Sequence, residues 1–194
     1  IELGFLAEQG RVIAITGTNG KTTTTTLTGE IMKAYFGKDK TFVVGNIGNP
    51  YTLEADKTSK DSVTVGEISS FQLETIHTFH PVVSAILNIT PDHLNRHHTM
   101  EAYVAAKEAV ASQQTKADIC VLNYDNDYTR DFAGRCPATP VLFSSHQELE
   151  NGYFLRGDKI IKSVNGEEHE LMDIHKDMNL VGLCNVENVM AAIA

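Results

Sequence analysis

The residues best suited to chemistry form one continuous run near the start of the chain: Gly17, Thr18, Asn19, Gly20, Lys21 and Thr22. Glycines let a backbone approach a ligand closely, a lysine adds a point charge, and a threonine hydroxyl suits Mg²⁺. A helix that begins here would add free N–H groups and a partial positive charge. These are the needs of a nucleoside triphosphate, so the run, extended by Thr23, predicts a phosphate-binding loop.

The segments on either side of this loop are of the right kind to hold it. An apolar run, Val12-Ile15, enters it as a strand, and a helix to about Phe36 follows, with Leu27, Ile31 and Ala34 at helical spacing. The loop is shorter than the common pattern, because Ile15 stands where the first glycine is expected. Residues 22–26 are all threonine, a poor helix former, so tertiary contacts must override propensity there. A plain glycine-rich turn is the alternative.

The remaining chain predicts an α/β fold in a single domain. Short β-rich runs alternate with segments long enough for crossover helices: Val12-Ile15, Phe42-Val44, Ser62-Val65, Val83-Ile89, Ile119-Leu122 and Val141-Phe143. Such apolar strands with helical connections indicate a mainly parallel sheet that is covered on both faces. Residues 152–172 predict a small antiparallel hairpin or meander, and residues 185–194 predict a helix.

Polar side chains follow two more of the predicted strands. Glu67 comes after the strand at 62–65, and His93 comes after the strand at 83–89. Ligands of open parallel sheets bind beyond the carboxyl ends of the strands, so both residues are candidates for metal ligands or for an acid and a base. Ser69 and Ser70 open the next helix, where they could cap it or bind an anion. Each of these residues also has an ordinary structural explanation.

Lys107 falls in the apolar stripe of a helix that begins at Thr99. A bare buried ammonium would be costly, so this side chain must reach water, pair with a carboxylate, or be chemically altered. The adjacent His97 and His98 are expected to be solvated rather than metal-bound. Asn46 follows another strand, where it is either a turn residue or a ligand contact.

Composition and charge exclude several classes of protein. The formal net charge is −9, which argues against a sequence-independent grip on nucleic acid or an anionic membrane. The cysteines, at 120, 136 and 184, are far apart, which argues against a disulfide framework or a cysteine zinc site and favours a reducing cytoplasm. The longest apolar stretch, Val82 to Ile89, is too short to span a bilayer. The absence of an initial Met and the end inside a helical pattern indicate a segment of a longer protein.

Five strings of residues together resemble the central domain of the Mur ligases, over nearly the whole chain: 17–22, 45–48, 67–74, 87–94 and 103–107. Among these ligases, Glu67-Ile68-Ser69-Ser70-Phe71-Gln72-Leu73-Glu74 is most similar to the D-glutamate-adding branch. The resemblance implies that ATP phosphorylates the carboxyl group of UDP-N-acetylmuramoyl-L-alanine in peptidoglycan precursor synthesis. The amine of D-glutamate then attacks the acyl phosphate.

The same resemblance implies a role for each matching residue. Lys21 and Thr22 would hold ATP phosphates and one Mg²⁺, with Glu67 as a ligand to that metal. His93 and a carbamylated Lys107 would serve a second Mg²⁺, which explains an otherwise costly buried lysine. Asn46 would contact the nucleotide phosphates. Ser69 and Gln72 would contact the sugar-nucleotide substrate. Asn185 and Asn188 would lie on the adenine side.

Two positions depart from the family pattern, since Cys184 stands where a histidine is usual and Asn95 where an aspartate is usual. The flanking domains, for the UDP moiety and for D-glutamate, are absent from residues 1–194, so this segment alone should not ligate. A monomer is expected. Three alternatives stay open: another amide-forming ligase of the family, a P-loop kinase or GTPase, and a nucleotide-binding module without chemistry.

Overall fold

The chain folds around one sheet of nine strands, described here for residues 1–194 from a computed structural model. The strand order is β2-β3-β1-β4-β5-β6-β7-β8-β9. All pairs from β2 to β7 are parallel, and β7–β8 and β8–β9 are antiparallel. The strands are β1 (Arg11–Thr16), β2 (Thr41–Gly45), β3 (Val63–Glu67), β4 (Val83–Ile86), β5 (Ile119–Asn123), β6 (Thr139–Ser144), β7 (Gly152–Arg156), β8 (Lys159–Val164) and β9 (Glu167–Asp173).

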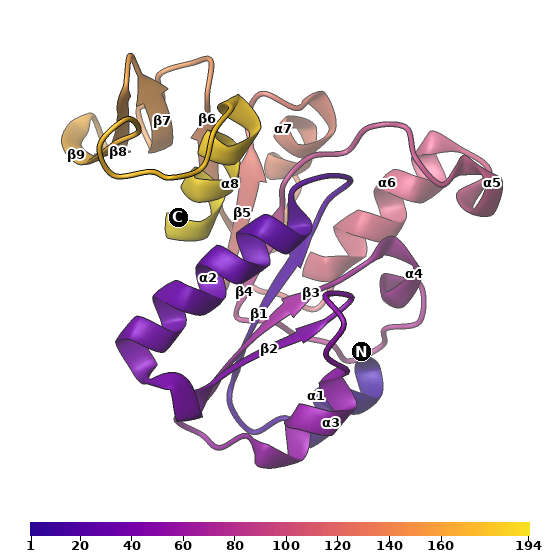
Figure 1. Cartoon of the computed structure of the whole chain (residues 1–194). Helices are drawn as coiled ribbons and strands as arrows, with labels where there is room; N and C mark the ends of the chain where they lie inside the picture. Colours follow the sequence, from indigo (N-terminus) through magenta and orange to yellow (C-terminus); the bar gives the residue numbers. More distant parts are fainter.

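Helices cover both faces of the parallel part of this sheet (Figure 1). They are α1 (Glu2–Ala7), α2 (Lys21–Phe36), α3 (Tyr51–Glu54), α4 (Ser70–Leu73), α5 (Leu94–His97), α6 (Met100–Glu108), α7 (Asp127–Ala133) and α8 (Leu183–Ile193). Three short 3₁₀ turns, at Lys38–Lys40, Ala55–Lys57 and Ala109–Ala111, complete the set. No helix is long and apolar enough to cross a membrane.

Alternate side chains along β1 enter two separate cores. Val12 and Ala14 of β1 lie in a cluster of 19 buried residues that also holds Tyr103 and Val104 of α6. Ile15 points the other way, into a cluster of 12 buried residues that α8 also fills. This alternation is the period-two pattern of a strand buried on both faces. The predicted α/β class with a mainly parallel sheet is therefore confirmed.

The predicted element boundaries need small corrections. The strand expected over residues 83–89 ends at Ile86, because Leu87 onward leaves the sheet to pair with the loop after β1. The strand expected over 62–65 runs from Val63 to Glu67, which puts the carboxylate on the strand itself. The antiparallel meander is confirmed as β7–β9, and it continues the main sheet because Phe143 of β6 pairs with Tyr153 of β7.

The threonine run does form helix, and its packing explains why. Thr24, Thr25 and Thr28 of α2 are buried. Thr24 also donates its hydroxyl to Asn188 of α8, at 3.3 Å. Contacts of α2 with the sheet and with α8 thus outweigh the weak helix propensity of threonine. The outcome is a helix whose first residue is Lys21, at the end of the glycine loop.

Candidate functional site

The glycine loop joins β1 to α2 and ends in a left-handed turn. Gly20 is the N-cap of α2, with φ of +84°. A Cβ on this residue would come within 2.2 Å of Asn188 Oδ1, so both the conformation and the space require glycine. Because no side chain caps α2, its first N–H groups remain available to an anion at the loop.

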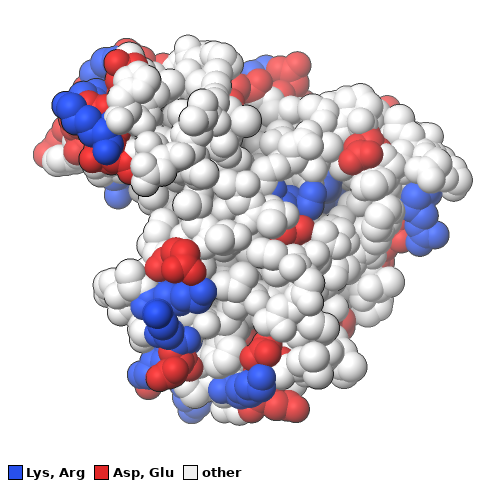
Figure 2. Space-filling view, in the orientation of Figure 1, with Lys and Arg blue, Asp and Glu red and all other residues white.

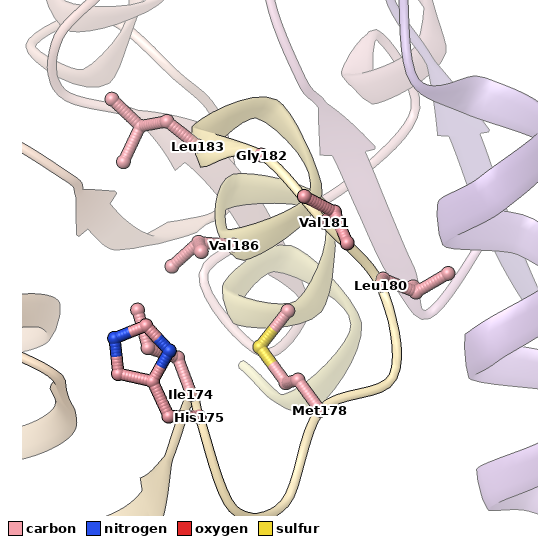
Figure 3. A pocket seen from close by; sticks show the side chains of 8 residues that line it. All are labelled: Ile174, His175, Met178, Leu180, Val181, Gly182, Leu183 and Val186. Atoms are coloured by element: carbon pink, nitrogen blue, oxygen red, sulfur yellow. The ribbon is translucent and has the colours of Figure 1, made fainter.

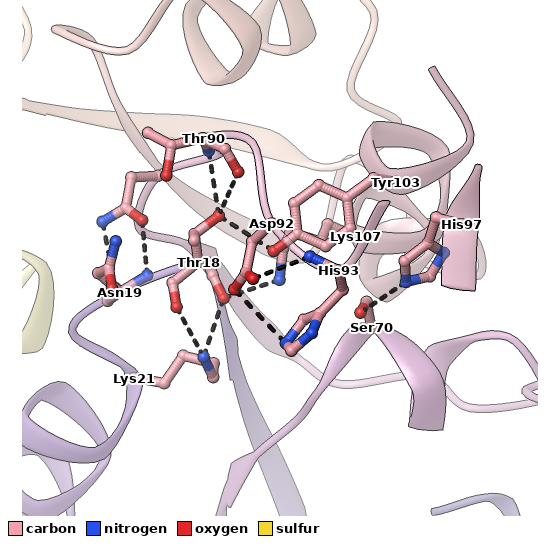
Figure 4. Close-up of polar contacts among 12 residues, drawn as sticks. Thr18, Asn19, Lys21, Ser70, Thr90, Asp92, His93, His97, Tyr103 and Lys107 are labelled. Carbon is pink, nitrogen blue, oxygen red and sulfur yellow. Dashed lines mark hydrogen bonds and ion pairs between the residues drawn. The ribbon is translucent and has the colours of Figure 1, made fainter. Parts of the chain in front are cut away.

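The loop is tied to the segment that follows β4. Thr18 N donates to Asn88 O at 2.9 Å, and Asn19 N donates to Asn88 Oδ1 at 2.8 Å. The Asn88 amide donates back to Asn19 O at 3.1 Å, and Thr90 N donates to the Thr18 hydroxyl at 3.0 Å. Figure 4 shows these contacts around Thr18 and Asn19. Asn88 was not assigned a role from the sequence, although it lies within the strand predicted over residues 83–89 and within the string 87–94 that resembles the family.

Lys21 is folded back over its own loop. Its ammonium donates to Gly17 O at 3.1 Å and to Thr18 O at 2.9 Å (Figure 4). No carboxylate lies within 4.0 Å of it. The charge is therefore held at the loop by neutral carbonyls, which leaves it available for a bound anion.

Glu67 contacts two of the other predicted residues directly. Its side chain accepts from the Thr22 hydroxyl at 2.8 Å and from the Asn46 amide at 2.8 Å. Asn46 N also donates to Glu67 O, at 2.9 Å. The residue is only 2% exposed, and no lysine, arginine or histidine lies within 4.0 Å of its carboxylate. A buried carboxylate without a cation is an expensive arrangement unless a ligand compensates it.

Lys107 approaches the glycine loop from α6. It is 2% exposed, and its ammonium donates to Gly17 O at 2.7 Å, the same carbonyl that accepts from Lys21. The ammonium also lies 4.8 Å from the ring centre of Tyr103, whose hydroxyl is 3.1 Å from that of Thr18. Burial, and then the charge of Lys21, lower the pKa of Lys107 to about 7. Of the three outcomes that the sequence left open for this side chain, exposure to water is excluded, because the loop closes over the amine.

His93 lies on the same side of the fold but is exposed. It is the N-cap of α5 and adopts a left-handed backbone conformation, with φ of +52°, which is uncommon outside glycine. Its ring nitrogen Nε2 is 3.4 Å from Asp92 Oδ2, and its ring packs 5.0 Å from that of Phe71. None of its hydrogen bonds or ion pairs reaches the glycine loop.

The expectation that His97 is solvated is wrong, although His98 is exposed as expected. His97 Nε2 lies 3.0 Å from the Ser70 hydroxyl, and its Nδ1 lies 3.4 Å from Glu74 Oε1. Its ring stacks on Phe71. This contact was not predicted, because sequence spacing gives no sign that His97 lies against Ser70 and Phe71 of α4.

Ser69 and Gln72 form a capping box at the start of α4. Gln72 N donates to Ser69 Oγ at 3.3 Å, and Ser69 N donates to Gln72 Oε1 at 2.9 Å. The predicted capping role of Ser69 is therefore confirmed. Both residues are partly exposed, and neither hydrogen-bonds to the glycine loop. Their predicted contact with a substrate stays a prediction.

Asn185 and Asn188 lie one turn apart on α8. The Asn188 amide donates to Asn185 Oδ1 at 3.2 Å, and its own oxygen accepts from Thr24 at 3.3 Å beside Gly20. The Asn185 amide donates to Val181 O at 2.8 Å. Thr23 lies in the first turn of α2 and is partly exposed. The structure thus joins α8 to the glycine loop through Asn188.

These contacts bring most of the predicted residues to one edge of the sheet. Lys21, Thr22, Asn46, Glu67 and Lys107 meet around the glycine loop through direct hydrogen bonds. Figure 2 shows a small group of basic atoms beside acidic atoms in the middle of this face, where Figure 1 has the loop between β1 and α2. Such a mixture of fixed cations, oxygen ligands and free N–H groups suits a phosphate with a metal ion.

One apolar pocket lies apart from this set (Figure 3). It has a volume of about 300 Å³ and lies between α8 and the segment after β9. Its lining is mostly hydrophobic: Ile174, His175, Met178, Leu180, Val181, Gly182, Leu183 and Val186. None of the residues predicted from the sequence belongs to it.

Comparison with known proteins gives one consistent family. The family model described as the Mur ligase middle domain matches residues 15–194. A UDP-N-acetylmuramoylalanine--D-glutamate ligase from Lachnospira eligens is 58% identical over 194 residues, which are 100% of this chain and 42% of that protein. The ligase of the same name from Clostridioides difficile is 48% identical over 196 residues, again 100% of this chain and 42% of that protein. The chain therefore spans 42% of the length of these relatives.

Solved structures show the same fold at lower sequence identity. A UDP-N-acetylmuramoyl-L-alanyl-D-glutamate--2,6-diaminopimelate ligase matches with a TM-score of 0.73 at 24% identity, over 96% of this chain and 42% of that one. A MurF ligase from Thermotoga maritima, solved in complex with ADP, matches with a TM-score of 0.67 at 17% identity. That match covers 98% of this chain and 47% of the other.

Proposed function

The chain belongs to the Mur ligase family, as a middle domain, and we propose that it is the ATP-handling part of a longer ligase. That ligase joins D-glutamate to UDP-N-acetylmuramoyl-L-alanine in peptidoglycan precursor synthesis. The relatives that match the whole chain carry this activity in their names. ATP activates the carboxyl group as an acyl phosphate, and the amine of D-glutamate displaces the phosphate.

The observation that carries the proposal is the contact of Glu67 with Thr22 and Asn46 beside the glycine loop. Lys21 and the N–H groups at the start of α2 bind and orient the phosphates of ATP. Asn46 contributes an amide donor to the same phosphates, and it keeps the Glu67 carboxylate in one orientation. The loop is therefore preorganised for the anion before the anion arrives.

The donor set around Glu67 also fits a magnesium ion. Thr22 supplies a hydroxyl and Glu67 a buried carboxylate that lacks any cationic partner. Mg²⁺ prefers such hard oxygen ligands, commonly one or two protein groups together with phosphate oxygens. When bound, the ion would neutralise part of the negative charge of the phosphates. Thr22 and Glu67 hold it at the loop.

Lys107 and His93 serve a second magnesium ion in this proposal. An amine whose pKa is lowered to about 7 is about half neutral at pH 7, and only the neutral amine combines with CO₂. The nitrogen forms a bond to the carbon of CO₂ and releases one proton, which leaves a carbamate anion. This change replaces a costly buried cation with an oxygen ligand. His93 contributes its imidazole from the adjacent loop.

The remaining predicted contacts are assigned from the family resemblance. Asn185 and Asn188 of α8 are proposed to contact the adenine, which is supported by the closeness of Asn188 to Gly20 of the glycine loop. Ser69 and Gln72 contact the sugar-nucleotide. Their side chains then hydrogen-bond to the substrate as well as to each other in the capping box. The flanking parts of the longer ligase select the UDP moiety and the amino acid.

ADP release by the longer protein tests the proposed function. The protein is incubated with ATP, Mg²⁺ and UDP-N-acetylmuramoyl-L-alanine, and single amino acids are added in separate reactions. D-glutamate should stimulate ADP release, and Lys107→Ala should abolish the stimulation unless a short-chain carboxylic acid replaces the carbamate. Stimulation by meso-diaminopimelate or lysine instead of D-glutamate would refute the substrate assignment. Full activity of Lys107→Ala without added acid would refute the role of the lysine.

A further inference from the structure

A second group of ligand-type side chains lies beyond the ends of β5 and β6, away from Glu67 and Lys107. Asp125 follows β5, His146 follows β6, and Glu187 lies on α8. One ligand atom of each residue lies within 4.8 Å of the other two. Three separate elements therefore bring two carboxylates and one imidazole to a single point.

Neighbouring serines fix the orientation of both carboxylates. The Ser144 hydroxyl donates to Asp125 Oδ1 at 2.6 Å, and Ser145 N donates to Asp125 Oδ2 at 2.6 Å. The Ser145 hydroxyl lies 2.7 Å from Glu187 Oε1 and 3.3 Å from Asp125 Oδ2. A hydroxyl has one hydrogen, so it cannot donate to both acids. Outer hydrogen bonds of this kind are what hold the ligands of metal sites in place.

The charge of this group is not balanced within the chain. No lysine or arginine nitrogen lies within 4.0 Å of the carboxylates of Asp125 and Glu187, although both acids are partly buried. Many exposed acids of the chain do have such a partner, among them Glu148, Glu168 and Glu170. Two carboxylates that face one hydroxyl repel each other, so a cation between them would stabilise the arrangement.

We propose that Asp125, His146 and Glu187 form a binding site for a divalent transition-metal ion of the zinc type. Mixed imidazole and carboxylate ligands suit Zn²⁺ best, because Zn²⁺ takes nitrogen ligands more readily than Mg²⁺ and Ca²⁺, which are bound mainly by oxygen. Ligand atoms around a tetrahedral Zn²⁺ lie about 3–4 Å apart, since each is about 2.0–2.2 Å from the metal. Movements of about one ångström within the group therefore close the site. His146 is exposed, so the ion can enter from solvent.

The position of this site gives it a structural consequence. Glu187 lies on α8 between Asn185 and Asn188, and Asn188 packs against Gly20 of the glycine loop. An ion held by Asp125, His146 and Glu187 ties this helix to the loops after β5 and β6. The ion therefore fixes the position of α8, the helix that contacts the glycine loop at Gly20.

Binding of Zn²⁺ to the 194-residue chain tests the proposal. The metal-free chain is titrated with Zn²⁺ by calorimetry, and Co²⁺ is added separately so that its visible absorption reports the ligands. The wild type should bind one ion per chain at this site. His146→Gln should weaken the affinity by more than about tenfold, since even outer-shell changes cost that much in metal sites. Glu187→Gln should do the same.

Two control variants keep the result specific. Cys184→Ser removes an exposed thiol on the same helix, and His175→Gln removes an exposed histidine that also lies beside an acid. Both should bind Zn²⁺ as the wild type does, and thermal unfolding without metal should show that every variant is folded. Zn²⁺ should raise the melting temperature of the wild type and not that of His146→Gln. Absence of binding to the wild type, or equal affinity in His146→Gln and Glu187→Gln, would overturn the proposal.

Discussion

The edge of the parallel sheet and the antiparallel extension β7–β9 use charged residues in opposite ways. At the edge, Glu67 and Lys107 are each 2% exposed, and neither has an opposite charge within 4.0 Å. In the extension, Arg156 lies between Glu148 and Glu168, at 2.6 Å and 2.7 Å, and all three are open to solvent. Acidic and basic side chains are therefore buried and without an ionic partner at the end of the parallel strands. In the antiparallel extension they are exposed and paired.

We propose that this difference separates residues that bind a ligand from residues that only face solvent. Burying an unpaired charge costs stability, so a fold keeps such a group only where something else compensates it. Exposed ion pairs cost little and contribute little, because water screens them. The contrast between the two regions predicts where a substitution will change stability and binding, and where it will not.

The largest effect is expected at Lys107, where Lys107→Met should stabilise the fold. The folded-state pKa of about 7 lies below the ordinary value of 10.5, so protonation of the buried amine opposes folding. This cost is absent above about pH 10.5, grows as pH falls, and is complete below about pH 7. Methionine removes it, which should gain a few kcal/mol at pH 7, on the order of 1.4 kcal/mol for each unit of lowering.

Urea unfolding of both proteins at several pH values between 7 and 10, in buffers free of CO₂, measures this difference. The advantage of Lys107→Met should shrink as the pH rises. Lys33→Met, on the outer side of α2, is the matched control and should show no such trend, since Lys33 pairs with Glu30 at the surface. Parallel stability curves for Lys107→Met and wild type would show that the amine is not buried in the way described.

A smaller effect is expected from the two glycines at left-handed turns, one in each region. Gly20 has φ of +84° and Gly157, between β7 and β8, has φ of +57°. Alanine at either position costs about 1–2 kcal/mol for the backbone conformation. Gly20→Ala also places a Cβ against Asn188, whereas nothing lies within 4 Å of a Cβ on Gly157.

Chemical denaturation of both variants should show Gly20→Ala to be the less stable, by about 1–3 kcal/mol beyond Gly157→Ala, which is the usual cost of crowding a packed site. Equal losses would mean that α8 moves away from the loop freely. In that case the contact between Asn188 and Gly20 would not fix the glycine loop.

The fold and the site could be predicted from the sequence only in part, and the reason is physical. Strand and helix periods are local, so the α/β class, the glycine loop and the ends of most strands could be predicted from the pattern. Contacts between distant segments are not local. The bonds of Asn88 to the loop and of Ser70 to His97 depend on how elements pack, and no spacing in the sequence shows them.

Lys107 illustrates the limit most clearly. Its place in an apolar stripe predicted burial, yet the sequence left exposure to water, pairing with a carboxylate and chemical modification all open. Only the closure of the glycine loop over the amine, with Gly17 O as its acceptor, decides against exposure to water. Chemical modification of this residue stays a prediction, as do the metal ligands.

The smallest effect is expected in the extension. Arg156→Ala removes contacts to both Glu148 and Glu168, but all three side chains are exposed. The melting temperature should therefore change by no more than about 2 °C, and less at high salt. Differential scanning calorimetry at low and high NaCl checks this. A large decrease in melting temperature that persists in high salt would contradict this expectation. It would mean that the extension depends on its charged residues as strongly as the site around Glu67 and Lys107 does.

Nucleotide binding to the isolated 194-residue chain tests the central claim most directly, namely that the loop between β1 and α2 holds the phosphates. ADP with Mg²⁺ is titrated calorimetrically into wild type, Lys21→Ala and the matched control Lys33→Ala on the same helix. We predict that Lys21→Ala weakens binding by more than about tenfold, in line with a lost charge-assisted hydrogen bond of about 1.5–3 kcal/mol, while Lys33→Ala binds as the wild type does. Equal affinity for all three proteins would contradict the account.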